Sequence, residues 1–134
     1  MKLILDTNVF ISGVFFSGPP YKILNAWRNQ AVELVISPEI FEEYHRVGQA
    51  LEKKFPGVDI DPILHLLMHS VEFVQVPDLP ERVCKDLDDD KFVACAIATG
   101  TNIIVTGDKE LLSVSGYSGI EVISPRTFVD KYLS

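Results

Sequence analysis

The sequence lacks the features that define several protein classes. Its 134 residues include two cysteines, Cys84 and Cys95, which are too few for a disulfide framework and do not have CxxC spacing. Apolar runs all fall short of the ~20 residues that a membrane-spanning helix needs. The amino terminus reaches an acid at Asp6, too early for a signal peptide. We therefore expect one cytoplasmic domain over residues 1–134, without membrane association.

Basic side chains are also scarce. Twelve Lys and Arg face nineteen Asp and Glu, which gives a net charge of −7. This balance argues against a broad basic face that binds nucleic acid through its phosphates. It leaves open nucleic acid held through a metal ion, and a basic partner that covers an acidic cleft. The 47% of hydrophobic residues is sufficient for a real core.

Short apolar segments alternate with amphipathic ones along the whole chain. Continuous apolar strands of this kind are typical of sheets covered on both faces. The order therefore predicts an α/β fold, a three-layer α/β/α sandwich with a mainly parallel central sheet. Ser37-Pro38-Glu39 is a typical helix start, with a capping Ser and a Pro in the first turn. The expected strands are 2–5, 32–36, 71–76, 103–105 and 120–123, and the main expected helices are 21–30, 38–55, 61–70, 90–99 and one after 125.

Four acids fall within the five residues of Asp86-Leu87-Asp88-Asp89-Asp90, just before an apolar helix. One or two carboxylates cap a helix start and favour its dipole. Four in a row repel one another, which points to a cation. The stretch alone fits both a solvated acidic cap and a metal site.

Further acids are expected at the same edge of the sheet. Asp6 and Asp108 follow strands, and Glu42 and Glu43 lie in the first turns of a helix. Ligands of parallel sheets bind at the carboxyl ends of the strands. Hard cations such as Mg²⁺ or Mn²⁺ prefer oxygen ligands, and they can activate water and stabilise charge on a phosphodiester. Neighbouring hydroxyl and amide groups could orient these acids, although capping is their simpler role.

Four segments, in family order, resemble the motifs of PIN domains, a family of metal-dependent nuclease domains. Ile4–Phe10 resembles the opening motif, with Asp6 as its acid. The segment Ser37–Tyr44 is similar to the second motif and places Glu43 in the metal-site position. Asp88–Ala96 resembles the third motif, with Asp90 as the ligand. Val105–Asp108 resembles the fourth motif, with Asp108 as the acid.

The resemblance implies an acidic pocket for Mg²⁺ or Mn²⁺ and an endoribonuclease that cuts single-stranded RNA. It carries over Asp6, Glu43, Asp90 and Asp108 as catalytic and metal-site acids, with Asn8, Asp88 and Thr106 in supporting roles. Small PIN proteins are often the toxins of toxin–antitoxin pairs, and this chain looks most like that bacterial and archaeal branch. The resemblance thus implies an antitoxin protein as a partner.

Other interpretations remain open from the residues alone. The chain could be a catalytically idle PIN-like module that binds RNA or protein, or a phosphoryl-transfer domain that uses Asp6. His65 and His69 have zinc-binding spacing, but Leu66 replaces the glutamate of HExxH proteases. The apolar run 9–16 could form a homodimer interface, although core packing is its simpler role. Arg46, Lys53 and Lys54 could meet an RNA backbone or form a solvated helix end.

Convergence of the acids has an electrostatic consequence that does not depend on the family. Like charges a few ångströms apart cost on the order of 1–4 kcal/mol per pair, depending on the effective dielectric. Some of the carboxylates are therefore expected to have raised pKa values in the metal-free protein.

Overall fold

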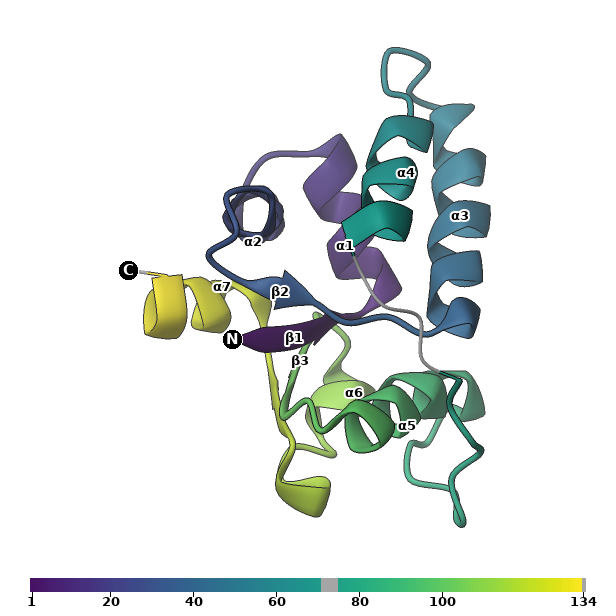
Figure 1. The fold of residues 1–134 in the computed structure, drawn as a ribbon, viewed down its shortest axis with the longest axis vertical. Helices are drawn as coiled ribbons and strands as arrows, with labels where there is room; N and C mark the ends of the chain where they lie inside the picture. The colour runs from purple at the N-terminus through teal and green to yellow at the C-terminus, as the bar shows by residue number, and fades with distance from the viewer. Residues whose placement is uncertain (71–74, 134) are drawn as a thin grey trace.

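A computed structural model describes residues 1–70 and 75–133 of the chain. Its elements alternate between strands and helices, and the four described strands lie within predicted ones, with an unpredicted helix added after the first strand (Figure 1). In chain order they are β1 (Lys2–Leu5), α1 (Thr7–Phe15), α2 (Pro19–Arg28), β2 (Glu33–Leu34), α3 (Pro38–Glu52), α4 (Asp61–Ser70), the 3-10 helix η1 (Leu87–Asp89), α5 (Asp90–Thr99), β3 (Ile103–Val105), α6 (Lys109–Leu112), the 3-10 helix η2 (Tyr117–Gly119), β4 (Glu121–Ile123), α7 (Pro125–Phe128) and the π-helical η3 (Val129–Leu133).

The described strands form one four-stranded parallel sheet with the order β2-β1-β3-β4. In Figure 1, α1 to α4 lie on one side of the sheet, and α5 and α6 lie on the other. The two central strands are almost completely buried, because their side chains are covered on both faces. This arrangement confirms the predicted α/β sandwich with a parallel central sheet.

Local sequence signals explain where the helices begin and end. The Ser37 hydroxyl accepts a hydrogen bond from the backbone N–H of Ile40 at 3.2 Å, so it caps α3 as expected. Helix α5 ends at Gly100, whose positive φ of 70° suits glycine. Helix α3 ends at Glu52, a few residues earlier than predicted. The strand predicted at 71–76 falls mainly on residues 71–74, which lie outside the described residues.

The core lies between the sheet and the helices, and it includes most of the apolar run after β1. Phe10 is fully buried and stacks on Tyr44 of α3 with ring centroids 4.2 Å apart. Phe16 is 47% exposed and packs against Phe55 near the end of α3. The run 9–16 therefore contributes mostly to the core. Within the described residues, every helix is too short or too polar to cross a bilayer.

Candidate functional site: an acidic centre at the carboxyl edge of the sheet

The pairing of the two central strands brings Asp6 and Thr106 together. Leu5 of β1 is in register with Val105 of β3, so the residues that follow the two strands are neighbours. The Thr106 hydroxyl donates to Oδ2 of Asp6 at 2.7 Å and accepts from the backbone N–H of Asp108 at 3.0 Å. Thr106 is fully buried. It therefore orients the Asp6 carboxylate and holds the backbone at Asp108, whose own Oδ1 accepts from the backbone N–H of Glu110 at 3.1 Å.

A tyrosine next to Glu43 fixes helix α3 against the end of β1. The buried Tyr44 hydroxyl donates to the backbone carbonyl of Leu5. The neighbouring Glu43 carboxylate, 13% exposed, accepts a hydrogen bond from the Thr7 hydroxyl through Oε1. Glu42 is exposed. Glu43, the glutamate expected from the second motif, is thus the one that lies beside the strand ends.

The three consecutive acids at the start of α5 point in three directions. Asp88 contacts the Lys91 ammonium at 3.1 Å. The Asp90 carboxylate accepts from the backbone N–H groups of Cys84, at 2.6 Å, and Val83, at 3.3 Å. Asp89 lies close to Asp6 and Asp108, whose charges raise its pKa. Of these three acids, Asp89 is thus the one whose carboxyl interacts with the strand-end acids, through a side-chain hydrogen bond with Asp108 and the charge of Asp6, while Asp90 binds backbone N–H groups.

This group of acids is electrostatically strained without a cation. Burial raises the pKa of Asp6, and the charges of Asp108 and Glu43 add to that effect, although hydrogen bonds from Thr106 and the Thr7 backbone oppose it. Burial, the charges of Asp6, Asp108 and Asp86, and a side-chain hydrogen bond with Asp108 raise the pKa of Asp89 to about 7. Raised carboxyl pKa values were the expectation for converging acids.

One carboxylate oxygen of this group has no hydrogen-bond partner among the described residues. Oδ2 of Asp89 is buried and has no hydrogen-bond partner in the described part of the chain. Such an orphaned carboxylate oxygen is costly unless a proton or a cation satisfies it. Asp6, Asp89 and Asp108 supply only oxygen ligands, which fit Mg²⁺ or Mn²⁺ better than softer metals.

Lys91 borders the centre, and the motif assignment gave it no role. Its side chain is 5% exposed, and its Nζ lies 2.6 Å from Oε2 of Glu43. Arg46 approaches the same oxygen at 3.8 Å from solvent. The signal that could have identified Lys91 is its position as the basic residue that directly follows the acidic run.

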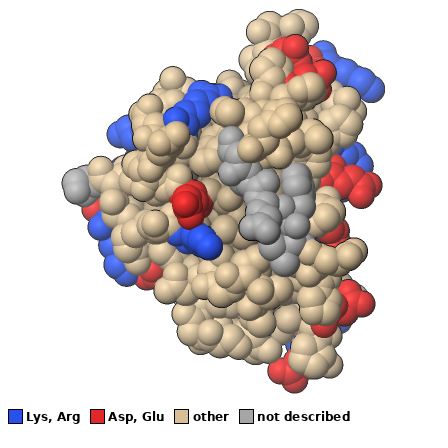
Figure 2. Space-filling model, viewed as in Figure 1, with Lys and Arg blue, Asp and Glu red and all other residues tan. Residues whose placement is uncertain are grey.

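The remaining predicted residues lie farther from these contacts. Asn8 is exposed in the first turn of α1, and both His65 and His69 are exposed on α4. Lys53 and Lys54 follow the end of α3 in solvent. On the face shown in Figure 2, charged side chains of both signs are scattered, and no broad basic band is present there, in keeping with the net charge.

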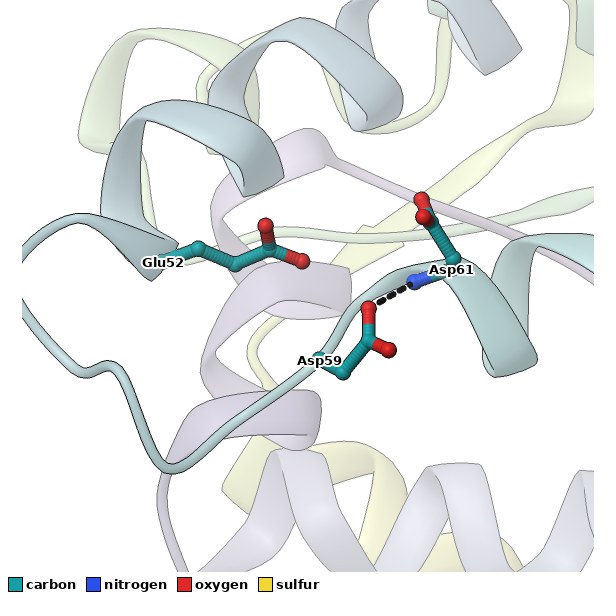
Figure 3. A group of neighbouring side chains, drawn as sticks. All are labelled: Glu52, Asp59 and Asp61. Carbon is teal, nitrogen blue, oxygen red and sulfur yellow. Dashed lines mark hydrogen bonds between the residues drawn. The ribbon is translucent and has the colours of Figure 1, made fainter.

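A second acidic group lies between α3 and α4, where its members perform local tasks. Glu52, Asp59 and Asp61 approach one another closely enough to hold an ion (Figure 3). Oε1 of Glu52 accepts from the backbone N–H of Ile60 at 2.5 Å, and Oδ1 of Asp59 accepts from that of Asp61 at 3.1 Å. Glu52 and Asp59 therefore serve as hydrogen-bond acceptors for backbone N–H groups in the loop and at the start of α4.

Comparisons with known proteins agree with the motif order. A sequence profile of the PIN domain matches residues 2–110. The chain is also 31% identical over 145 aligned residues to the uncharacterized protein MJ1680 of Methanocaldococcus jannaschii. That alignment covers 98% of this chain and 92% of the archaeal protein.

Proposed function

Because the chain belongs to the PIN domain family, we propose that it is a metal-dependent endoribonuclease that hydrolyses single-stranded RNA. PIN domains are generally nucleases, and they typically use divalent metals. The observation that carries the proposal is the buried, unpartnered Oδ2 of Asp89 beside Asp6 and Asp108. A solvated acidic cap would leave its carboxylates in water or on backbone N–H groups.

We propose as metal ligands the three acids that interact electrostatically at the edge of the sheet. Asp6, Asp89 and Asp108 would hold Mg²⁺ or Mn²⁺, and the Thr106 hydroxyl orients the Asp6 carboxylate. A bound divalent ion supplies an activated water and neutralises charge that develops on the phosphodiester. Asp90, the ligand expected from the motif, instead anchors the 83–84 backbone beside the helix start.

Cleavage assays with matched variants test this function. Labelled single-stranded RNA should be cut with Mg²⁺ or Mn²⁺ and left intact with a chelator. Asp6→Asn and Asp108→Asn should each slow cutting at least about a hundredfold, because each removes charge from the metal site while preserving shape. Asp59→Asn, a control in the second acidic group, should cut at the wild-type rate. Cutting that survives Asp6→Asn but is lost in Asp59→Asn would refute the assignment.

We further propose that the protein acts in the cytoplasm as the toxin of a toxin–antitoxin pair, and that it self-associates. The motif resemblance supports the first role, and exposed Phe16 and Phe55 support the second. A basic side chain of an antitoxin would pair strongly with the acidic centre. Growth arrest on expression, relieved by the product of the adjacent gene, tests the toxin role.

Sedimentation tests self-association, and a strict monomer would refute it.

A further inference from the structure

The Lys91 side chain places a positive charge between two acids, Glu43 and Asp88. Its ammonium contacts three acceptors: Oε2 of Glu43 at 2.6 Å, Oδ1 of Asp88 at 3.1 Å and the Asp88 carbonyl at 2.8 Å. An ammonium has three donor protons, so these contacts use its full capacity. The two carboxylates and the carbonyl therefore fix the ammonium in this position.

The charged side chains form two groups, of which one contains basic residues and the other contains only acids. Glu43 and Asp88 are paired with Lys91, and Arg46 lies 3.8 Å from Glu43, so this group is close to neutral. The other group comprises Asp6, Asp89 and Asp108. The like charges of these three carboxylates repel one another, and Oδ2 of Asp89 is buried without a hydrogen-bond partner in the described part of the chain. Only the second group lacks a positive partner among the described residues.

Glu43 is restrained on both of its oxygens. Oε1 accepts from the Thr7 hydroxyl, and Oε2 accepts from Lys91. Coordination of a divalent ion through Oε2 would bring that ion against the ammonium, which like-charge repulsion disfavours. The family motif counts Glu43 among the metal-site acids, whereas here the Thr7 hydroxyl and the Lys91 ammonium occupy its two oxygens.

Building on the proposed nuclease function, we propose that Lys91 is a positioning residue that takes the place of a second metal ion. The centre then binds one divalent ion through Asp6, Asp89 and Asp108, while Lys91 holds Glu43 out of its coordination shell. Removal of the ammonium would leave Glu43 and Asp88 as a vacant pair of carboxylates.

Equilibrium Mn²⁺ binding tests this role without reference to activity. Every protein in the titration carries Asp59→Asn, because Glu52, Asp59 and Asp61 approach closely enough to hold an ion of their own. Each chelator-stripped full chain is titrated with Mn²⁺, and free Mn²⁺ is read from its electron paramagnetic resonance signal. Wild type should bind one ion, and Lys91→Gln should bind two. Lys85→Gln removes the same charge from a side chain that is 83% exposed, and it should still bind one ion. Lys91→Arg, which keeps the positive charge, should also bind one.

A second comparison, of Glu43→Gln with Asp108→Asn, keeps Lys91 in place. It tests whether Glu43 is a metal ligand even if Lys91→Gln does not fold. Glu43→Gln should weaken Mn²⁺ binding by no more than about fivefold, as expected for a charge removed at a distance in screened solvent. Asp108→Asn removes a ligand and should weaken binding at least about tenfold more than Glu43→Gln does.

The outcomes separate this assignment from the nuclease proposal. Two ions in wild type, one ion in folded Lys91→Gln, or equal losses in Glu43→Gln and Asp108→Asn would each overturn the role of Lys91 and leave the nuclease proposal standing. Wild type that binds no Mn²⁺, together with RNA cutting that survives a chelator, would overturn the metal-dependent function and this assignment with it.

Discussion

Replacement of Asp89 by Asn should stabilise the metal-free protein at neutral and alkaline pH. The wild-type carboxylate is held near Asp6 and Asp108, and its Oδ2 is buried without a hydrogen-bond donor in the described part of the chain. Asn has nearly the same shape, carries no charge and offers an N–H₂ group to the neighbouring carboxylates. The substitution therefore removes repulsion and can supply donors that the site lacks.

The magnitude follows from the pKa of Asp89, which burial and the neighbouring acids raise from 3.8 to about 7. A shift of this size corresponds to about 4 kcal/mol of destabilisation once both folded and unfolded states are ionised. Asp89 is only half-buried, so solvent screening reduces this to about 1–2 kcal/mol. For a chain of this length, Asp89→Asn should then raise the melting temperature by about 3–8 °C above pH 7.

The pH dependence has a definite sign. Since the pKa is raised in the folded state, the folded protein binds the proton more tightly than the unfolded chain does. The destabilisation is absent below about pH 4, grows through the interval to about pH 7 and is constant above it. The advantage of Asp89→Asn over wild type should follow the same course in chelator.

Melting curves at pH 4, 6 and 8 provide the assay, with Asp90→Asn as the matched control. Asp90 accepts two backbone N–H bonds, so its replacement should lower stability by about 1 kcal/mol. Mn²⁺ at a hundred times its dissociation constant should add about 2.7 kcal/mol to wild type and less to Asp89→Asn. An Asp89→Asn protein that is less stable than wild type at pH 8 in chelator would refute the placement of Asp89 in the centre.

Three further substitutions have expected effects that follow from single contacts. Thr106→Val removes the hydroxyl that orients Asp6, and it should reduce RNA cleavage at least about tenfold in a gel assay while leaving the far-ultraviolet circular dichroism spectrum unchanged. Tyr44→Phe removes the buried hydrogen bond to the end of β1 and should lower the free energy of unfolding by about 1–2 kcal/mol in urea titrations. Gly13→Ala would place a Cβ 2.7 Å from Leu24 at the α1–α2 contact, and it should cost about 1–3 kcal/mol by the same measurement.

Much of the fold could be predicted because its signals are local. The apolar strands Lys2–Leu5 and Ile103–Val105 lie in the structure as the sequence indicates, and Ser37 caps its helix. The end of α3 was placed too late, because Lys53 and Lys54 continue a helical composition while the chain turns after Glu52. Helix ends with weak stop signals depend on tertiary contacts, which a single sequence does not contain.

The edge of the sheet was also predictable as the location of the acids. Asp6 and Asp108 follow adjacent parallel strands, and the rule for such sheets places ligands there. The contact of Thr7 with Glu43 was harder to foresee, since it depends on how Tyr44 fixes α3 against β1. That contact joins residues 36 positions apart, and no local pattern encodes it.

The direction of each acid in the run 88–90 depends on a detail of helical geometry that the sequence does not determine. Successive side chains turn by about 120° in a 3-10 helix and by about 100° in an α-helix. Asp89 ends η1 and Asp90 begins α5, so their side chains point about 100–120° apart, and the rotation of the helix about its axis, which tertiary contacts set, decides which of them faces Asp6 and which faces the 83–84 backbone. A motif that contains an acidic run therefore predicts that one of its carboxylates lies at the centre, but it does not determine which residue of the run that is. The opposite stability changes expected for Asp89→Asn and Asp90→Asn convert that one-residue difference into a measurable result.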